Sequence, residues 1–429
     1  MLRSMFSAIS GLRAHQTKMD VVGNNIANVN TVGYKSQTTV FEDTLSQLLR
    51  NGSAPTADTA GTNPAQVGLG VKVASVSTNF SQGSTQNTGR STDFMISGDG
   101  FFTTKSGNEN LYTRAGSFDF DGVGNLVTPD GAILQGWTAD STGAINTNGP
   151  VGNLSIPYGQ VINPEETTAG AITGNLSAEA VATDAPVQTQ ATMYDSLGNA
   201  HQVTYVFQKT ATAGAWKLNV LDENGNTLLP TTGAPPVPTL VDVTFNASGA
   251  MTAPSIASSP APVDGKFTFD PTSTFASWAG PVTVDLSGVT QYGGKSTATT
   301  TTPAAGAGSA LGTLESFSLG SDGTITGTYS NGLKKSLGQL ALATFSNPSG
   351  LTKAGNSSFR VGNNSGNPLV GIAGTGGRGT LTAGALEMSN VDLSEEFTGL
   401  IVAQRGFQAN SKVITTSDEI LQTLVNMKN

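Results

Sequence analysis

Both ends of the chain carry an apolar residue at every seventh position. Near the C-terminus the repeat consists of Leu393, Leu400, Phe407, Ile414 and Leu421, extended by Phe397, Ala403, Leu424 and Val425. Near the N-terminus it consists of Met5, Leu12, Met19 and Ile26, flanked by Leu2, Ile9, Val22 and Val29. A sustained repeat of seven is typical of helices that pack along a seam against other long helices. We therefore predict a coiled-coil helix at each end, over residues 1–30 and 393–429.

The last helix is expected to begin at Asp392, because Glu395 follows three residues later in a capping-box arrangement. At ~1.5 Å per residue it would be roughly 50 Å long, too long to be covered by a small core. Residues 1–50 hold five basic and three acidic side chains (net +2), and 386–429 hold three basic and six acidic ones (net −3). This opposition favours pairing of the two ends, although exposed charges contribute little. The alternative is that each end is an ordinary amphipathic surface helix.

The composition excludes several classes of protein. At 429 residues the chain should form two to four domains. It has no cysteine, which excludes disulfides, thiol catalysis and thiolate metal sites, and its net charge of −9 argues against a nucleic-acid partner. The sequence contains no apolar run long enough to span a membrane. The first apolar run is short and is followed by Arg13, so we expect a protein that is either cytoplasmic or exported without a cleaved signal peptide.

Two sequence signatures indicate a family. The stretch 23–35, with Asn24, Asn25, Ile26, Asn28, Gly33 and Tyr34, resembles the NNIANxxTxGYK signature of the bacterial flagellar rod and hook family. Residues 388–393 and 401–410 resemble the C-terminal signature of the same family. Stretches 68–73, 93–102, 193–201 and 322–325 are similar to the hook members in particular, and the likeness is weakest in 161–190 and 230–312.

The resemblance implies a structural role and no enzymatic activity. Hook subunits polymerise into a curved, flexible tube that transmits torque from rod to filament. The implied partners are other copies of the chain, a distal rod protein, a hook cap protein, hook-filament junction proteins and the flagellar type III export apparatus. The implied location is the extracellular hook of the flagellum. Assembly is expected to use the seam residues together with Asn24, Asn25, Ile26, Asn28, Gly33 and Tyr34.

The asparagines also have a physical interpretation that is independent of the family. Asn tolerates left-handed backbone and bonds to neighbouring peptides, so Asn24, Asn25, Asn28 and Asn30 can end the first helix and fix the next turn. A catalytic cluster of amides is the less favoured alternative.

Between the ends the apolar period changes to two. Val71 and Val73, then Trp216, Leu218 and Val220, alternate with polar residues, and the same pattern recurs at 241–245 and 282–286. Asp-Gly and Asn-Gly pairs at 99, 121, 130, 224, 322 and 331 supply hairpin turns between half-buried antiparallel strands. The predicted fold class is mainly β with paired terminal α-helices. A short helical run is expected at 41–50.

Composition suggests how the β regions are nested. Segments 163–190 and 293–313 are rich in Thr, Ala, Gly and Ser and are expected to be linkers. Residues 161–312 should form an inserted outer β domain, and 71–160 with 313–380 a discontinuous inner β domain. Residues 31–70 and 381–392 should be connectors. Lys209 is expected on an outer strand, where substitution would matter little.

Chemical motifs elsewhere are weak. The stretch 374–379 satisfies G-x-G-x-x-G, but no helix is expected after it. Residues 119–122 and 222–226 hint at calcium loops but lack the full ligand spacing. Ser196, His201 and Asp195 could form a hydrolase-like Ser-His-Asp group, but the sequence around Ser196 lacks a nucleophile elbow. His15 is expected to be packed in the seam of the first helix. We therefore predict no catalytic or metal residues, no cofactor and no small-molecule substrate.

Two alternative functions remain open. A distal rod protein of the same family shares both end signatures, although such proteins are typically shorter and the insertion at 161–312 argues against one. A secreted β-rich adhesin with coiled-coil ends would form trimers instead of a helical tube.

Overall fold

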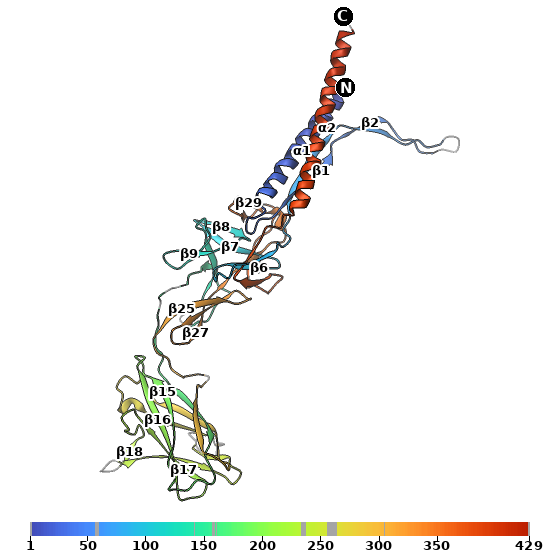
Figure 1. Cartoon of the computed structure of the whole chain (residues 1–429). Coiled ribbons are helices and arrows are strands. Elements are labelled where there is room, and N and C mark those ends of the chain that lie inside the picture. Colours follow the sequence, from blue (N-terminus) through green and yellow to red (C-terminus); the bar gives the residue numbers. More distant parts are fainter. Residues whose placement is uncertain are drawn as a thin grey trace. The chain divides into compact units, whose positions relative to one another are not determined.

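The computed structural model confirms the predicted fold class: the chain is mainly β, with one long helix at each end, and the two helices pack against each other (Figure 1). It describes residues 2–427 except 56–59, 141, 157, 158, 160, 233–236, 255–263 and 304. Helix α1 spans Leu2–Ala27 and α2 spans Leu393–Asn426. The predicted cap is confirmed, because the Asp392 carboxylate accepts hydrogen bonds from the N–H groups of Ser394 and Glu395 at 2.8 and 3.4 Å.

The chain divides into two compact units. The first comprises Met1–Pro157, Phe317–Gly327 and Lys335–Asn429, and the second comprises Tyr158–Ser316 and Thr328–Lys334. The finer nested division of the sequence analysis stays a prediction.

Most strands of the first unit belong to one large sheet, in which a central path runs β27-β11-β7-β8-β30-β29, and four two-stranded sheets, β1-β4, β2-β3, β32-β6 and β33-β5, are separate from it. Its core contains Phe94, Phe102, Phe118, Leu126 and Leu134, which are fully buried. Three strands, β25, β26 and β27, have residues in both units. The strands of this region are β1 Gln37–Asp43, β2 Ser46–Arg50, β3 Ala65–Gly68, β4 Val71–Thr78, β5 Thr85–Asn87, β6 Phe94–Ser97, β7 Phe101–Ser106, β8 Glu109–Thr113, β9 Asp119–Phe120, β10 Leu126–Val127, β11 Ile133–Thr138, β12 Gly152–Asn153, β25 Gly312–Leu319, β26 Thr324–Tyr329, β27 Lys334–Leu340, β28 Leu342–Thr344, β29 Thr352–Gly355, β30 Ser358–Arg360, β31 Leu369–Gly371, β32 Thr380–Ala383 and β33 Ala385–Glu387.

The helical run predicted at 41–50 is wrong, because strands β1 and β2 occupy this stretch. Strand β1 pairs antiparallel with β4 from Gln37↔Thr78 to Asp43↔Val71, and β2 pairs with β3. A partner strand distant in sequence overrides the local helical pattern here. The stretches 31–70 and 381–392, expected to be connectors, therefore contain strands, and β32 and β33 pair with β6 and β5.

The second unit is a β sandwich. One sheet has the order β15-β16-β17-β20-β21 and the other β22-β23-β14-β24, and both contribute to one core that includes Phe207, Leu218, Val220, Val282 and Val284. The predicted period-two stretches at 216–220 and 282–286 are thus confirmed as core strands. The strands are β13 Val161–Ile162, β14 Ala169–Asn175, β15 Val187–Tyr194, β16 Ala200–Lys209, β17 Ala215–Leu221, β18 Thr231–Thr232, β19 Val237–Pro238, β20 Val241–Phe245, β21 Met251–Ala253, β22 Lys266–Phe269, β23 Val282–Thr290 and β24 Thr297–Thr301.

Three expectations about these strands need correction. The supposed linkers 163–190 and 293–313 contain β14 and β24, which are neighbours in the sandwich; their small residues belong to strands. Pairing is not antiparallel throughout, since β14 and β23 run parallel. Of the predicted turn glycines, Gly122 lacks a positive φ, and in that turn Gly124 has φ 90°.

Candidate assembly interface

Gly11 of α1 and Gly406 of α2 each lie in close contact with a side chain of the opposite helix. A Cβ placed on Gly11 of α1 would lie 2.8 Å from the side chain of Asn410, and one on Gly406 of α2 would lie 2.5 Å from the ring of His15. Either distance is too short for an unshifted side chain, so these two glycines permit the observed helix separation. The side chains buried along the two helices are correspondingly small or polar: Ala8, Ala14, Val22, Asn25, Ala403 and Ser417.

Most residues of the predicted heptads lie beside this seam. They are half-buried in one chain: Met5, Leu12, Met19, Ile26, Leu400, Phe407, Ile414 and Leu421. Val22 and Ala403 are buried, whereas Ile9, Leu393, Phe397 and Val425 are exposed. The side chains of Leu2 and Leu424 lie outside the described residues. The heptad positions therefore flank the closest contact, and their role in assembly remains a prediction.

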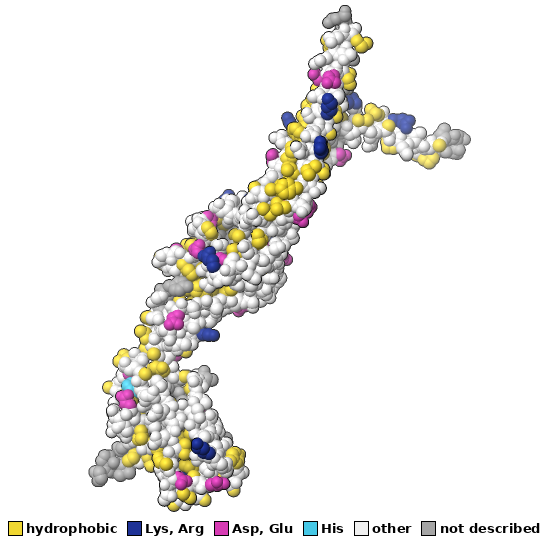
Figure 2. All heavy atoms as spheres, viewed as in Figure 1, with side chains coloured by type: hydrophobic (Ala, Val, Ile, Leu, Met, Phe, Trp, Pro, Cys, Tyr) yellow, Lys and Arg dark blue, Asp and Glu magenta, His cyan; other side chains and the backbone are white. Residues whose placement is uncertain are grey.

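The two helices expose further large apolar side chains that the heptad analysis missed. Phe6 of α1 is 67% exposed, and Ile401 and Val402 of α2 are 57% and 55% exposed. Figure 2 shows hydrophobic side chains gathered along the helical part of the chain. We call the following residues the exposed helix set: Phe6, Ile9, Leu393, Phe397, Ile401, Val402, Val413, Ile420, Val425 and Met427. Ile9, Leu393, Phe397 and Val425 of this set were already predicted; counting every apolar residue of each helix would have found the others.

A second exposed apolar surface lies on the hairpin of β2 and β3, which extends away from the helices in Figure 1. Every residue of β2 is exposed. The apolar side chains of this hairpin arm are Leu45, Leu48, Leu49, Val67 and Leu69, with Leu45 82% exposed. A two-stranded hairpin is marginally stable alone, and contiguous exposed apolar residues mark interaction sites.

Asn25 connects α1, α2 and the segment that follows α1. Its side chain is fully buried and makes four hydrogen bonds. The amide nitrogen donates to the carbonyl of Gln37 at 2.8 Å and to the Glu396 carboxylate at 2.7 Å, and the amide oxygen accepts from the N–H of Gln37 and the Tyr34 hydroxyl. Burial raises the pKa of Glu396 despite the Asn25 hydrogen bond. The predicted turn-fixing role of Asn25 thus includes a contact to the opposite end of the chain.

The other signature residues order the turn after α1. The Asn28 side chain donates to the carbonyl and side-chain oxygens of Asn24 and accepts from the Thr31 hydroxyl. Gly33 has φ 67° and donates to the carbonyl of Glu387, and a Cβ there would lie 2.4 Å from a backbone nitrogen. This position therefore requires glycine. The turn holds the N-terminal signature against a strand near the C-terminus.

A buried ion cluster lies beside this turn, and the sequence analysis did not identify it. The Lys35 ammonium lies 2.7 Å from the Glu387 carboxylate, with both side chains 0% exposed, and Arg114 lies 3.3 Å from the same carboxylate. The Ser81 carbonyl accepts from Lys35, and the N–H of Gly83 donates to Glu387. Burial lowers the pKa of Lys35, although the hydrogen bond and charge of Glu387 oppose this. The lysine of the GYK signature was the available signal, but its partner is 352 residues away.

His15 lies in the helix seam as predicted. Its ring packs edge-on against Phe41 of β1 at 5.7 Å between centroids. Burial, with a smaller contribution from the Lys18 charge, lowers the pKa of His15. Within the described part of the chain its Nδ1 has no hydrogen-bond partner. The imidazole is a packing element between α2 and β1.

The hydrolase alternative has no supporting geometry. The Ser196 hydroxyl donates to the backbone carbonyl of Ser277, and the Ser277 hydroxyl donates to Asp195. His201 contacts Asp195 at 3.4 Å through Nε2. Neither serine hydroxyl is directed at the imidazole, so the arrangement ties a turn to its neighbour.

The calcium-like loops are hydrogen-bonded turns. The carboxylates of Asp121 and Asp222 each accept backbone N–H groups two and four residues later and the side-chain amide of Asn125 or Asn226. Their oxygens are therefore occupied by the loop itself.

The glycine-rich stretch 374–379 is followed by a strand, β32, and not by the helix that a nucleotide-binding loop would need. Among the described residues, no three His, Asp or Glu side chains gather in a way that could hold a metal ion.

The expectation for Lys209 is wrong. The side chain is 7% exposed, and its ammonium donates to the carbonyls of Thr210, Thr212 and Ala215 and lies 5.8 Å from the ring centre of Trp216. The long apolar stem lets this lysine be buried at the end of a strand. Its replacement by Asp would remove all three bonds, so it is no neutral control.

Models of four flagellar families match the chain. They are described as flagella basal body rod protein (residues 5–35), flagellar hook protein FlgE/F/G D1 domain (95–175), flagellar basal body protein FlaE D2 domain (168–306) and flagellar basal body rod FlgEFG protein C-terminal (382–427).

Relatives that align over the whole chain are also named as flagellar proteins. The chain is 38% identical over 459 residues to the flagellar hook protein FlgE of Borreliella burgdorferi, covering 100% of both chains. It is 32% identical to the flagellar basal-body rod protein FlgG of Bacillus subtilis, again over 100% of both. A crystal structure of a flagellar hook protein of Helicobacter pylori aligns at a TM-score of 0.47 and 14% identity, over 69% of this chain and 98% of that one.

Proposed function

The chain belongs to the family of flagellar hook proteins and is a structural subunit of the hook, and we propose that its copies polymerise through their terminal helices and hairpin arms. In this proposal the polymer is the curved, flexible tube that transmits torque from rod to filament. The subunit acts mechanically and has no catalytic role.

The exposed helix set carries this proposal. A fully buried Phe or Ile side chain is worth about 1.5–3 kcal/mol, yet Phe397 and Ile401 are 50% and 57% exposed in one chain. Large contiguous apolar surfaces on soluble proteins mark interaction sites. Neighbouring copies that cover these residues would supply the missing burial.

Head-to-tail contacts explain why such a surface would give a tube instead of a dimer. When one patch of a subunit binds a different patch of the next, and the rotation does not close a ring, the result is a helical filament. The helices and the hairpin arm present two different apolar patches on one unit. We propose that assembly uses both.

The alternative of a distal rod protein of the same family fits the relatives less well than the hook subunit. The Bacillus relative named as a rod protein matches over its full length, so chain length does not separate the two roles. The hook assignment is preferred because relatives with higher identity, at 38% and 37%, are named hook proteins.

Partners and location follow from the proposed role. We propose contacts with a distal rod protein, a hook cap protein and hook-filament junction proteins, and delivery by the flagellar type III export apparatus without a cleaved signal peptide. The place of action would be the extracellular hook. None of the helices in the described part of the chain is long and apolar enough to cross a membrane.

Electron microscopy of the concentrated, purified chain tests the proposal. We expect hollow tubes built from a helical array, forming above a critical concentration. A β-rich adhesin with coiled-coil ends would instead give discrete trimers whose mass, measured by light scattering, does not grow with concentration. Trimers without tubes would overturn the proposed role.

A further inference from the structure

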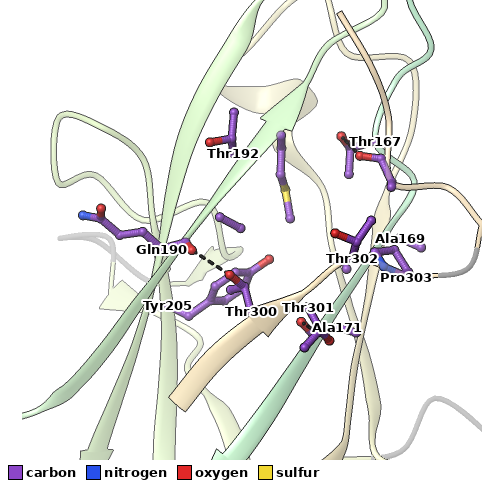
Figure 3. A pocket seen from close by; sticks show the side chains of 14 residues that line it. Thr167, Ala169, Ala171, Gln190, Thr192, Tyr205, Thr300, Thr301, Thr302 and Pro303 are labelled. Carbon is purple, nitrogen blue, oxygen red and sulfur yellow. Dashed lines mark hydrogen bonds between the residues drawn. The ribbon is translucent and has the colours of Figure 1, made fainter. Parts of the chain in front are cut away.

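The β sandwich of the second unit contains a cavity that the assembly role does not use. Its volume is about 310 Å³, and it lies between the edge strand β15 and the strands β14 and β24 (Figure 3). All of its lining residues belong to the second unit. The cavity is therefore a feature of one folded copy.

The lining is polar without being charged. Its described residues include Thr167, Thr192, Thr300, Tyr205 and Gln190, whose side-chain amide points away from the other lining side chains in Figure 3, and they include no Lys, Arg, His, Asp or Glu. A charged ligand would lose its hydration without gaining a counter-charge. The Thr167 hydroxyl already donates to the Ala307 carbonyl and accepts from the N–H of Tyr194. The Thr192 hydroxyl accepts from the Gln202 amide and can still donate, and the Thr300 hydroxyl donates to the Gln190 carbonyl and can still accept. A lining that keeps both roles suits a neutral ligand that donates and accepts.

One hydroxyl of the lining is buried and unused. Tyr205 is 1% exposed, and its hydroxyl has no hydrogen-bond partner among the described residues. Figure 3 shows the side chain pointing from β16 into the space between the two sheets. Buried polar groups are almost always paired, so an unpaired phenol facing a cavity indicates a missing partner.

Space beside this hydroxyl is kept open by a glycine and a methionine. A Cβ on Gly170 would lie 3.6 Å from the Tyr205 hydroxyl and 3.4 Å from the methyl group of Met193. Met193 and Tyr205 both lie beside this space, and a methionine side chain rearranges easily. Rearrangement of Met193 would therefore change the room available next to the Tyr205 oxygen.

We propose that this cavity binds a small, neutral polyhydroxy ligand about the size of one sugar ring, with the Tyr205 hydroxyl as a hydrogen-bond partner at its floor. The volume is at the small end of ligand pockets, roughly 300–1,000 Å³. An extended peptide is disfavoured, because the Thr300 hydroxyl already donates to the Gln190 carbonyl that an added strand would need.

The test is ligand-observed saturation-transfer NMR on the full chain below its polymerisation concentration. Methyl α-D-glucopyranoside is the neutral probe, acetate the charged control, and maltotriose distinguishes a free sugar from the end of a glycan. We expect roughly millimolar binding of the glucoside and none of acetate. Binding of maltotriose through its terminal ring alone would assign the site to glycan ends, whereas its exclusion would assign it to free sugars.

Variants localise the site. Tyr205→Phe should weaken glucoside binding by about fivefold while leaving the melting temperature unchanged, since none of the described residues is a hydrogen-bond partner of its hydroxyl. Gly170→Leu should fill the cavity and abolish binding. Tyr194→Phe removes a hydroxyl from the same sheet outside the lining and should have no effect. If Gly170→Leu does not fold, the binding measured for Tyr205→Phe alone tests whether the glucoside occupies this cavity. Absence of saturation transfer, or equal binding by Tyr205→Phe and the unchanged chain, would show that the cavity holds only water.

Discussion

The β sandwich and the terminal helix pair bury their large apolar side chains to opposite extents. In the sandwich Phe207, Leu218 and Val220 are 0% exposed, whereas Phe397 and Ile401 on α2 are 50% and 57% exposed. The sandwich thus completes its core within one copy. In the helix pair, glycines lie in close contact with the opposite helix while larger side chains still face solvent, which fits the proposed role of this pair as one part of an interface between copies.

This difference predicts how the free subunit behaves. Long helices with little tertiary packing are marginal in water. We therefore expect the terminal helices to be the first part of an unassembled subunit to unfold or to be cleaved by protease. The following variants test whether the two regions are as independent as this comparison implies.

The largest effect is expected from Phe397→Asp. In one chain the ring is half-exposed, so the folded subunit should lose little stability. In the polymer the change would lose apolar burial and desolvate a carboxylate, and a loss of about 4 kcal/mol would raise the critical concentration nearly a thousandfold. Sedimentation of polymer from free subunit measures it. Leu197→Asp, at a 70% exposed position in a sandwich turn, is the matched control. Equal assembly by both variants would show that this part of α2 stays uncovered in the tube.

The next largest effect should come from Lys35→Met in the buried ion cluster. Removing one partner of a buried ion pair typically costs about 3–5 kcal/mol when the other charge is left uncompensated. Arg114 still lies 3.3 Å from the Glu387 carboxylate, so we expect the lower end of this range. The melting temperature of the first unit should therefore fall by roughly 10 °C, and that of the sandwich should not change. Lys217→Met is the control, since its ammonium and the paired Asp242 carboxylate are 40% and 65% exposed. A shift in both transitions would mean that the units do not melt independently.

Asp195→Asn probes the sandwich through pH. Burial alone would raise the pKa of Asp195, but hydrogen bonds from Ser277 and Asn199 outweigh it and hold this pKa well below its usual value. A carboxyl with a lowered pKa stabilises the fold above its unfolded pKa, ~3.9, and loses that contribution as pH falls through the folded pKa. The variant should lose about 1–3 kcal/mol at pH 7 and show a flatter decline between pH 4 and 2. Melting curves recorded at several pH values for this variant and for Asp242→Asn measure the effect, since the Asp242 carboxylate is largely exposed. If the two variants melt identically at every pH, the Asp195 carboxylate does not stabilise the sandwich.

A matched pair of glycine variants sharpens the description of the helix seam. Gly→Ala favours an isolated helix by about 1 kcal/mol at either position. A Cβ on Gly23 meets nothing within 4 Å, whereas one on Gly406 lies 2.5 Å from His15. We expect Gly23→Ala to assemble as well as the unchanged chain or better, and Gly406→Ala to need about tenfold more subunit. If both substitutions change the critical concentration in the same direction, the helix seam relaxes around the methyl group added at Gly406.

The sequence predicted what depends on local or periodic signals. The cap at Asp392, the heptad helices and the alternating strands around Trp216 and Val284 all follow from side chains near one another in the chain. The seam was harder to predict, because a heptad identifies apolar positions but not that Gly11 and Gly406 set the distance between the helices.

The remaining failures involve partners distant in sequence. Nothing near Lys35 reveals that Glu387 neutralises it. Nothing near Phe41 reveals that β4 turns an apparent helix into a strand, and the threonines of β24 resemble a linker until β14 pairs with them. The exposed leucines of the hairpin arm fit the proposed contacts with other copies, which a single sequence does not display.

The smallest effect on assembly is expected from replacing residues 161–312 with a short Gly and Ser linker. The ends of this segment are already adjacent, because Val161 and Ile162 pair with Thr313 and Gly312 across β13 and β25. A short linker can therefore bridge the cut without strain. Since the exposed helix set and the hairpin arm lie outside the deletion, the variant should form tubes at nearly the original critical concentration. Its tubes should bend differently in electron micrographs if the sandwich contributes to curvature. A variant whose first unit melts normally but that forms no tubes would show that the sandwich itself supplies assembly contacts, and would remove the contrast between the two regions.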